Sequence, residues 1–127
     1  MVVGEVLTDD EVDRIFRALA DATRRDIVRR TLIGQESVSQ LASDYAMSFA
    51  AVQKHVAVLE RAGLVIKEMH GRERLVRGNP VVIRQAQALL DSYERIWQSR
   101  IDRLDALLAT DTLPDSNDVD DDPFDDN

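Results

Sequence analysis

The spacing of apolar residues predicts helices over most of the chain. Thr8 followed three residues later by Glu11 forms a capping box, and the apolar positions after it predict a first helix over about 9–20. Asp21 is suited to cap a second helix that runs through Leu32, with Leu32 facing inward.

Two further helices follow at short intervals. Gly34 is expected to end the second helix in the left-handed conformation, and Ser37 to begin a short third one. Ser48 is suited to cap a fourth helix over 48–62, which Gly63 closes. The third helix contains the apolar residues Val38, Leu41 and Ala42. In the second and fourth helices the positions expected to face the core include Ile27, Val28, Val52, Val56 and Leu59. The third and fourth helices, joined by about four residues, form a helix-turn-helix.

The pattern then changes to short β-branched runs. Residues 64–69 and 72–77 predict a β-hairpin with Gly71 at its tip. A last helix is expected over 80–109, because asparagine at 79 and proline at 80 suit a cap and a first turn. The chain is therefore predicted to be mainly α with a small β-hairpin: a winged helix-turn-helix with five helices, the hairpin lying between the fourth and the fifth.

The last helix carries an apolar stripe whose members are spaced three or four residues apart, close to a heptad pattern. This last-helix stripe comprises Ile83, Ala86, Leu90, Tyr93, Trp97, Ile101, Leu104 and Leu108. A helix of this length extends about 45 Å, more than a small body covers. Either the helix merely overhangs the core, or the stripe is buried against a second copy, and we favour the second interpretation.

Length and composition narrow the function classes. The 127 residues suffice for one domain, and the absence of cysteine excludes disulfides, thiolate metal sites and a cysteine nucleophile. No apolar run approaches the length of a bilayer span, and seven of the first 20 residues are charged, so we expect a cytoplasmic protein without membrane contact. No catalytic constellation or Gly-rich phosphate loop is evident, so we expect no enzyme and no cofactor.

The net charge of −8 is concentrated at one end of the chain. Residues 111–127 hold eight of the 24 acids and none of the 16 bases, which leaves 1–110 neutral. Within that body, 47–77 carries six bases and three acids. We therefore expect a DNA-binding and dimerisation domain over 1–110 and an acidic, disordered tail over 111–127.

A helix-turn-helix followed at once by a hairpin suits duplex DNA. The second helix of such a pair enters the major groove, where Gln53 can contact adenine and Phe49 a thymine methyl group. Ser48 lies where a phosphate can bind. The residues expected to contact DNA are Ser48, Phe49, Ala50, Gln53, Lys54, His55, Lys67, Arg72 and Arg74.

Each of these residues also has a structural interpretation. Gln53 and Lys54 are alternatively a solvated helix face, Phe49 alternatively packs on the third helix, and the arginines at 72 and 74 are alternatively ordinary surface charges. We expect His55 to be a structural or phosphate-contacting residue rather than a metal ligand. The order of elements favours DNA binding; the alternative is a winged-helix module that binds protein and reads no DNA sequence.

Several segments together resemble one family of regulators. The segments that closely resemble the ArsR/SmtB family are 18–25, 38–42, 47–65, 71–74 and 93–104, the last being similar to its metal-free branch. The resemblance implies a homodimeric repressor that binds an inverted-repeat operator and pairs through its first and last helices. The dimer residues it implies are Val12, Ile15, Phe16, Leu90, Tyr93, Trp97, Ile101, Leu104 and Leu108.

The chain departs from the family's metal sensors and from its common base-reading residue. Ser37 and Ser39 stand where thiolate sensors carry cysteines, the last helix has no histidine, and Gln53 replaces the frequent serine or threonine. We therefore expect no metal site, and base preference is not implied. The acids of the last helix are expected to pair with its arginines: Asp91, Glu94, Asp102 and Asp105 with Arg84, Arg95 and Arg103. Release from DNA is left open between a small apolar effector and a change in abundance.

Overall fold

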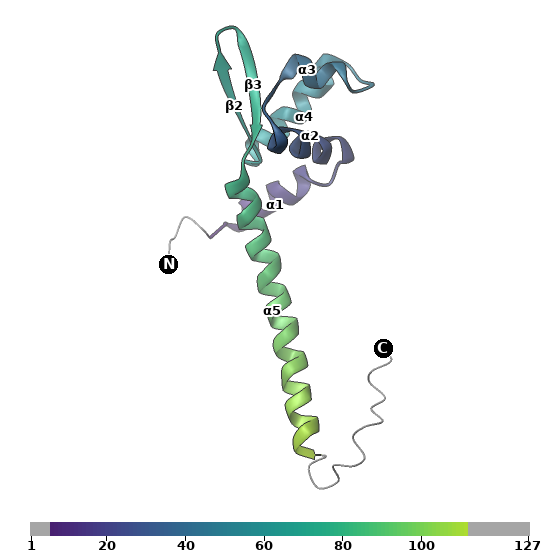
Figure 1. The fold of residues 1–127 in the computed structure, drawn as a ribbon, viewed down its shortest axis with the longest axis vertical. Coiled ribbons are helices and arrows are strands. Elements are labelled where there is room, and N and C mark those ends of the chain that lie inside the picture. The colour runs from purple at the N-terminus through teal and green to yellow at the C-terminus, as the bar shows by residue number, and fades with distance from the viewer. Residues whose placement is uncertain (1–5, 112–127) are drawn as a thin grey trace. The chain divides into compact units, whose positions relative to one another are not determined.

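The computed structural model describes residues 6–111. In that range the elements run α1 (Asp9–Ala18), α2 (Ala22–Ile33), β1 (Glu36–Ser37), α3 (Val38–Ser43), α4 (Phe49–Arg61), β2 (Val65–His70), β3 (Glu73–Gly78) and α5 (Pro80–Asp111) (Figure 1). The predicted class and order of helices are confirmed. The chain divides into two units, the first ending at Ala88 and the second beginning at Leu89, and each is described by itself. The acidic tail predicted from 111 onward lies, beyond the end of α5, outside the described residues.

Side-chain caps set the starts of the helices as the sequence predicts. Thr8 Oγ1 accepts from the backbone N–H of Glu11 at 3.1 Å, and the Glu11 carboxylate accepts from the N–H of Thr8 at 2.8 Å. Asp21 Oδ2 accepts from the N–H of Arg24 at 3.0 Å, and Ser48 caps α4 in the same way. Each cap satisfies an amide that has no partner within its helix.

The sheet has one strand more than the predicted hairpin. β3 lies in the middle, antiparallel to both β2 and β1, and Glu36 pairs with Val76. Ser37 ends β1 and caps α3, so one residue serves both elements. A two-residue strand shows no alternation in the sequence, which is why the pattern missed it. The wing tip is as predicted, with Gly71 at a φ of +64°.

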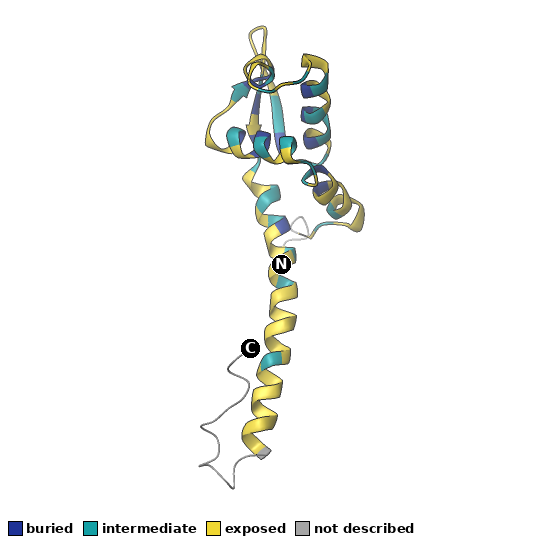
Figure 2. Ribbon diagram, turned by 90° about the vertical axis from the view of Figure 1, so that its right-hand side faces the viewer, coloured by how far each residue is buried: buried dark blue, intermediate teal, exposed yellow. Residues whose placement is uncertain are grey.

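The core of the first unit draws on every helix and on the two wing strands β2 and β3. Its buried apolar residues are Ile15, Ala18, Ile27, Val28, Val38, Leu41, Val52, Val56, Leu59, Leu64, Val65, Val76 and Ala86 (Figure 2). α2 packs against β3 and α4, and α3 packs against α4. The helix-turn-helix and the wing are therefore held by one shared core.

Two expectations about the end of α2 are wrong. Leu32 does not face the core: it is 44% exposed and lies over the backbone of Gly78, where an added Cβ would come within 2.6 Å of Leu32 Cγ. Gly34 ends α2 in an extended conformation, with a φ of −169°, because the chain turns directly into β1. Gly63 after α4 does adopt the left-handed conformation, with a φ of +78°.

Candidate nucleic-acid interface

One face of α4 is buried and the opposite face is exposed. Val52, Val56 and Leu59 are fully buried, which turns the residues between them outward. The predicted contact residues Phe49, Ala50, Gln53 and Lys54 are all exposed and lie in the first two turns of the helix. Phe49 is 47% exposed, so contacts inside the protein leave about half of this residue in solvent. A helix with an exposed N-terminal half has the form that fits a major groove.

Ser48 stands at the start of this face. Its Oγ accepts from the N–H of Ala51 at 3.1 Å, and its side chain is exposed. The cap engages a lone pair and leaves the hydroxyl hydrogen able to donate. This geometry suits contact with a phosphate oxygen at the helix start.

His55 is held in place by contacts with neighbouring elements. Its Nδ1 lies 3.2 Å from Arg24 Nη1 and 3.9 Å from Asp21 Oδ2. Arg24 also donates to the carbonyl oxygens of Ala18, at 2.7 Å, and Arg17, at 3.2 Å. The imidazole thus links α4 to the start of α2 and, through Arg24, to the end of α1.

Asp21 gives this region a predictable response to acid. The backbone N–H of Arg24 lowers the pKa of the Asp21 carboxyl below its ordinary value of 3.8, and His55 and Arg24 add to the effect. A lowered pKa means that the carboxylate stabilises the fold fully above pH 3.8, and that this contribution is lost as the pH falls through the folded-state pKa.

We therefore expect Asp21→Asn to lower the free energy of unfolding at pH 7 and to matter less below pH 3.8. Asparagine still caps a helix, so the charge alone is tested, whereas Asp21→Ala should cost about 1 kcal/mol at neutral pH through loss of the cap. Urea unfolding at fixed protein concentration measures the free energy of unfolding of both variants at each pH. A deficit for Asp21→Asn that stays constant from pH 7 to pH 3 would contradict the assignment.

The wing carries positive charge mainly at its tip. Lys67 Nζ lies 3.5 Å from Glu60 Oε1, and Arg77 Nη2 lies 3.3 Å from Glu68 Oε2, so both cations are partly compensated. Arg72 and Arg74 are exposed beside the tip, and no ion pair joins either to a described carboxylate. Of the three predicted wing contacts, the two arginines are better placed than Lys67 to meet a phosphate.

The last-helix stripe divides between the two units. In the first unit Ala86 is buried and Ile83 packs against the core. In the second unit Leu90, Tyr93, Trp97, Leu104 and Leu108 are exposed, and Ile101 is half-buried (Figure 2). Two further exposed residues that the spacing rule passed over are Ile96 and Leu107. Taken by itself, the second unit leaves a broad apolar surface in water, which is typical of an interface.

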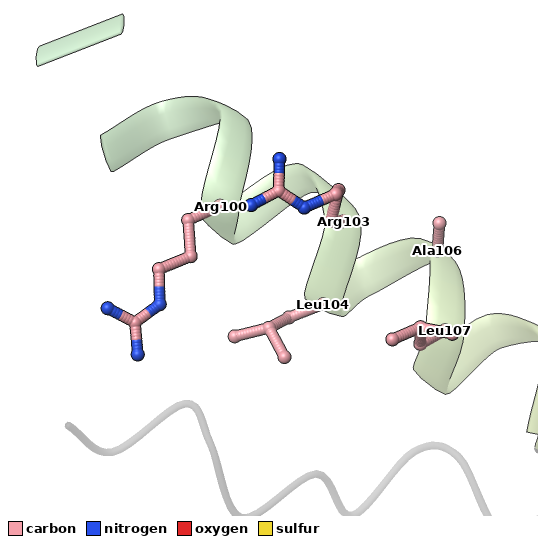
Figure 3. A pocket seen from close by; sticks show the side chains of 5 residues that line it. All are labelled: Arg100, Arg103, Leu104, Ala106 and Leu107. Carbon is pink, nitrogen blue, oxygen red and sulfur yellow. The ribbon is translucent and has the colours of Figure 1, made fainter. Parts of the chain in front are cut away.

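A shallow hollow lies on this helix near its C-terminal end. Its lining is Arg100, Arg103, Leu104, Ala106 and Leu107, with Arg100, Leu104 and Leu107 on one side of the helix (Figure 3). The Arg100 guanidinium lies 5.9 Å from the centre of the Trp97 ring. All the lining side chains come from one helix, which buries too little of a small molecule to hold it. The apolar surface suits a second protein chain better than an enclosed ligand.

Fewer side chains of the first helix are accessible to a second copy than the resemblance implies. Ile15 is only 1% exposed because it lies in the core of its own subunit, so it is corrected to a core residue. Val12 is half-buried and Phe16 is exposed, so these two side chains remain accessible.

The ion pairs expected along α5 are absent among the described residues. Arg103 instead donates to Ser99 Oγ, and Gln98 donates to Asp102 Oδ1, both at 3.2 Å.

Metal ligation and membrane insertion are two further properties to consider for the described residues. No three acidic or histidine side chains among residues 6–111 lie close enough together to hold a metal ion. In the same range no helix combines the length and the apolarity needed to cross a membrane.

Comparison with known proteins identifies relatives of this chain. Residues 21–67 match the family described as "Bacterial regulatory protein, arsR family". The HTH-type transcriptional regulator Rv2034 of Mycobacterium tuberculosis is 39% identical over 85 residues, which cover 67% of this chain and 77% of that protein.

Solved structures agree with this relationship. The ArsR-like transcriptional regulator from Rhodococcus sp. RHA1 is similar with a TM-score of 0.69 and 28% identity, over 77% of this chain and 92% of that one. The homodimeric winged helix-turn-helix DNA-binding domain of Mb0332 from Mycobacterium bovis shares the fold, with a TM-score of 0.56 and 22% identity over 69% of this chain and 88% of that one. The predicted winged helix-turn-helix is thereby confirmed.

Proposed function

Because the chain belongs to the ArsR family of bacterial regulatory proteins, we propose that it is a homodimeric repressor that binds an inverted-repeat operator in duplex DNA. Helix α4 enters the major groove and the wing tip contacts the flanking phosphates. Chromosomal DNA as the target makes the cytoplasm the place of action. No catalytic step, cofactor or metal ion is needed for this function.

The observation that carries the proposal is the exposed face of α4. Gln53 and Lys54 lie side by side in its first two turns, on a helix whose other face is anchored in the core. Glutamine presents a donor and an acceptor to the edge of adenine, whereas lysine meets phosphate or guanine. Arg72 and Arg74 at the wing tip add charge that orients the domain on the duplex.

Dimerisation would place two such faces on one side of the duplex. The exposed part of the last-helix stripe, Leu90 to Leu108, is the surface proposed to bury itself against the second copy, with Val12 and Phe16 contributing from α1. In a two-fold dimer the half-sites lie about 34 Å apart, one turn of B-DNA. The operator is then an inverted repeat, because protein symmetry is mirrored in the sequence it reads.

Selection of bound fragments from genomic DNA with the purified full chain tests this function directly. We expect enrichment of a short inverted repeat whose half-site centres lie about 10 base pairs apart. Recovery of fragments without a common sequence would overturn the proposal and favour the protein-interaction module.

Gln53→Ala is expected to weaken binding to the enriched duplex by about 1–3 kcal/mol while leaving binding to random duplex nearly unchanged. Truncation removes a base contact but no charge, so the non-specific attraction persists. Fluorescence anisotropy with both duplexes at one salt concentration measures the two affinities. Gln87→Ala, at an exposed glutamine of α5, is the matched control and should bind both as the wild type does. An equal loss on both duplexes would show that Gln53 reads no base.

A further inference from the structure

A cluster of polar side chains connects α2 to β1 and to the turn after α3, apart from the residues proposed to contact DNA. This Arg30 cluster comprises Asp26, Arg30, Glu36, Asp44 and Tyr45. Arg30 stands at its centre: Nε donates to Glu36 Oε2 at 3.0 Å, while Nη2 donates to Glu36 Oε1 and to Asp44 Oδ2, the latter at 2.8 Å. The Arg30 side chain is 17% exposed and that of Glu36 is 23% exposed, so the two bonds to Glu36 are largely shielded from water, whereas the Asp44 side chain is 58% exposed.

Tyr45 completes the cluster from the turn between α3 and α4. Its ring centre lies 5.5 Å from the Arg30 guanidinium carbon, and its hydroxyl donates to Asp26 Oδ2 at 2.5 Å. Burial, with the hydrogen bond to Asp26, raises the pKa of Tyr45 to about 12, so the hydroxyl remains a donor at neutral pH. The Glu36 carboxylate raises the pKa of Arg30, which stays charged throughout.

The cluster joins three segments that are separate in the sequence. Glu36 belongs to β1, which pairs with the wing strand β3 through Val76. Asp44 caps the C-terminus of α3, and Tyr45 follows it in the turn, three residues before the N-cap of α4 at Ser48. Arg30 on α2 therefore holds the edge of the wing sheet and the turn that leads into the recognition helix at the same time.

We propose that Arg30 is a positioning residue that fixes the recognition helix relative to the wing, so that both reach one operator half-site without reordering. This inference rests on the proposed function and assigns Arg30 no contact with DNA. A planar guanidinium can bind two carboxylates and stack on a ring at once, whereas a lysine ammonium cannot. A site that is already ordered avoids the entropy cost of ordering on binding, and that saving applies to the operator-specific complex.

The test compares Arg30→Met and Arg30→Lys with the matched control Arg29→Met. Arg29 neighbours Arg30 on α2, carries the same charge and is exposed. Its partner among the described residues is Asp26 Oδ1, so Arg29→Met leaves Asp26 Oδ2 bonded to Tyr45 and leaves the bonds of Arg30 in place. The probes are the duplex enriched from genomic DNA and a random duplex of equal length. All variants are measured at a temperature where circular dichroism shows them folded.

We expect Arg30→Met to bind the enriched duplex at least tenfold more weakly than Arg29→Met does, while both bind the random duplex equally. Non-specific binding depends on total charge, which the two variants share, whereas specific binding depends on position. Arg30→Lys keeps the charge, so its affinity for the enriched duplex should fall severalfold while its affinity for the random duplex should not change. If wild type prefers the enriched duplex and Arg30→Met retains that preference, this inference is overturned and the proposed function stands. If wild type itself shows no preference, the proposed function fails and the inference fails with it.

Hydrogen exchange on the free protein supplies a readout that needs no DNA. In Arg30→Met the amides of residues 45–49 should exchange faster than in Arg29→Met, while those around Val52 and Val56 in the core of α4 should not. Faster exchange throughout α4, with equal losses on both duplexes, would show a general loss of stability and overturn the positioning role.

Discussion

Replacing Trp97 by alanine is expected to convert the homodimer into monomers at micromolar concentration. Trp97 is 56% exposed in the single chain and lies near the middle of the exposed part of the last-helix stripe. Large aromatic side chains at the centre of an interface account for much of its binding energy. Truncating a buried tryptophan costs about 3–5 kcal/mol, which corresponds to a dimer dissociation constant raised about 10²–10⁴-fold.

Sedimentation velocity over a range of protein concentrations measures this shift. Ile33→Ala is the matched control, because Ile33 is 77% exposed and apolar but belongs to α2 and not to the stripe. The control should sediment as the wild type does. A Trp97→Ala protein with an unchanged profile at micromolar concentration would contradict burial of the stripe against a second copy.

The helix starts could be predicted because their signals are local. Thr8, Asp21 and Ser48 each cap the helix that the sequence assigns to them, and the bonded amide lies three residues further along. Caps of this kind depend on side-chain chemistry and short spacing, not on the rest of the fold. The same holds for the wing tip, where a positive φ selects glycine at position 71.

Features that depend on distant partners were predicted less well. Leu32 fits the inward pattern of α2, but its position over Gly78 depends on where β3 lies, which helical spacing does not encode. β1 exists because β3 offers it a free edge. Ile15 fits a surface stripe and a core equally well, and only packing against its own subunit decides between them.

In the candidate site, too, features set by local spacing could be predicted and features set by distant partners could not. The exposed face of α4 follows from the buried positions 52, 56 and 59, so Gln53 and Lys54 could be placed from spacing alone. The compensation of Lys67 by Glu60 could not, because it joins α4 to a strand that begins after the turn. The Arg30 cluster could not be predicted either, because its members are spread over twenty positions and only the fold brings them together.

The two arginines at the wing tip should account for a measurable share of the salt dependence of DNA binding. Each exposed arginine that neutralises a phosphate releases a counterion, and a dimer carries each residue twice. Arg72→Ala combined with Arg74→Ala thus removes about four phosphate contacts and should reduce the slope of log K against log salt by about 3.6. Between 50 and 200 mM salt, the affinity of the variant should then fall on the order of 10²-fold less than that of the wild type.

The matched control tests whether free charge, rather than any wing cation, produces this effect. Arg77 lies on the same hairpin but pairs with Glu68 at 3.3 Å, so Arg77→Ala should change the slope much less than either tip substitution alone. Titrations on the random duplex suffice, because phosphate contacts are independent of sequence. An unchanged slope in the double variant would show that the wing tip does not contact the phosphates of the DNA. An equal effect of Arg77→Ala would show that the ion pairs on the hairpin do not restrain its cations.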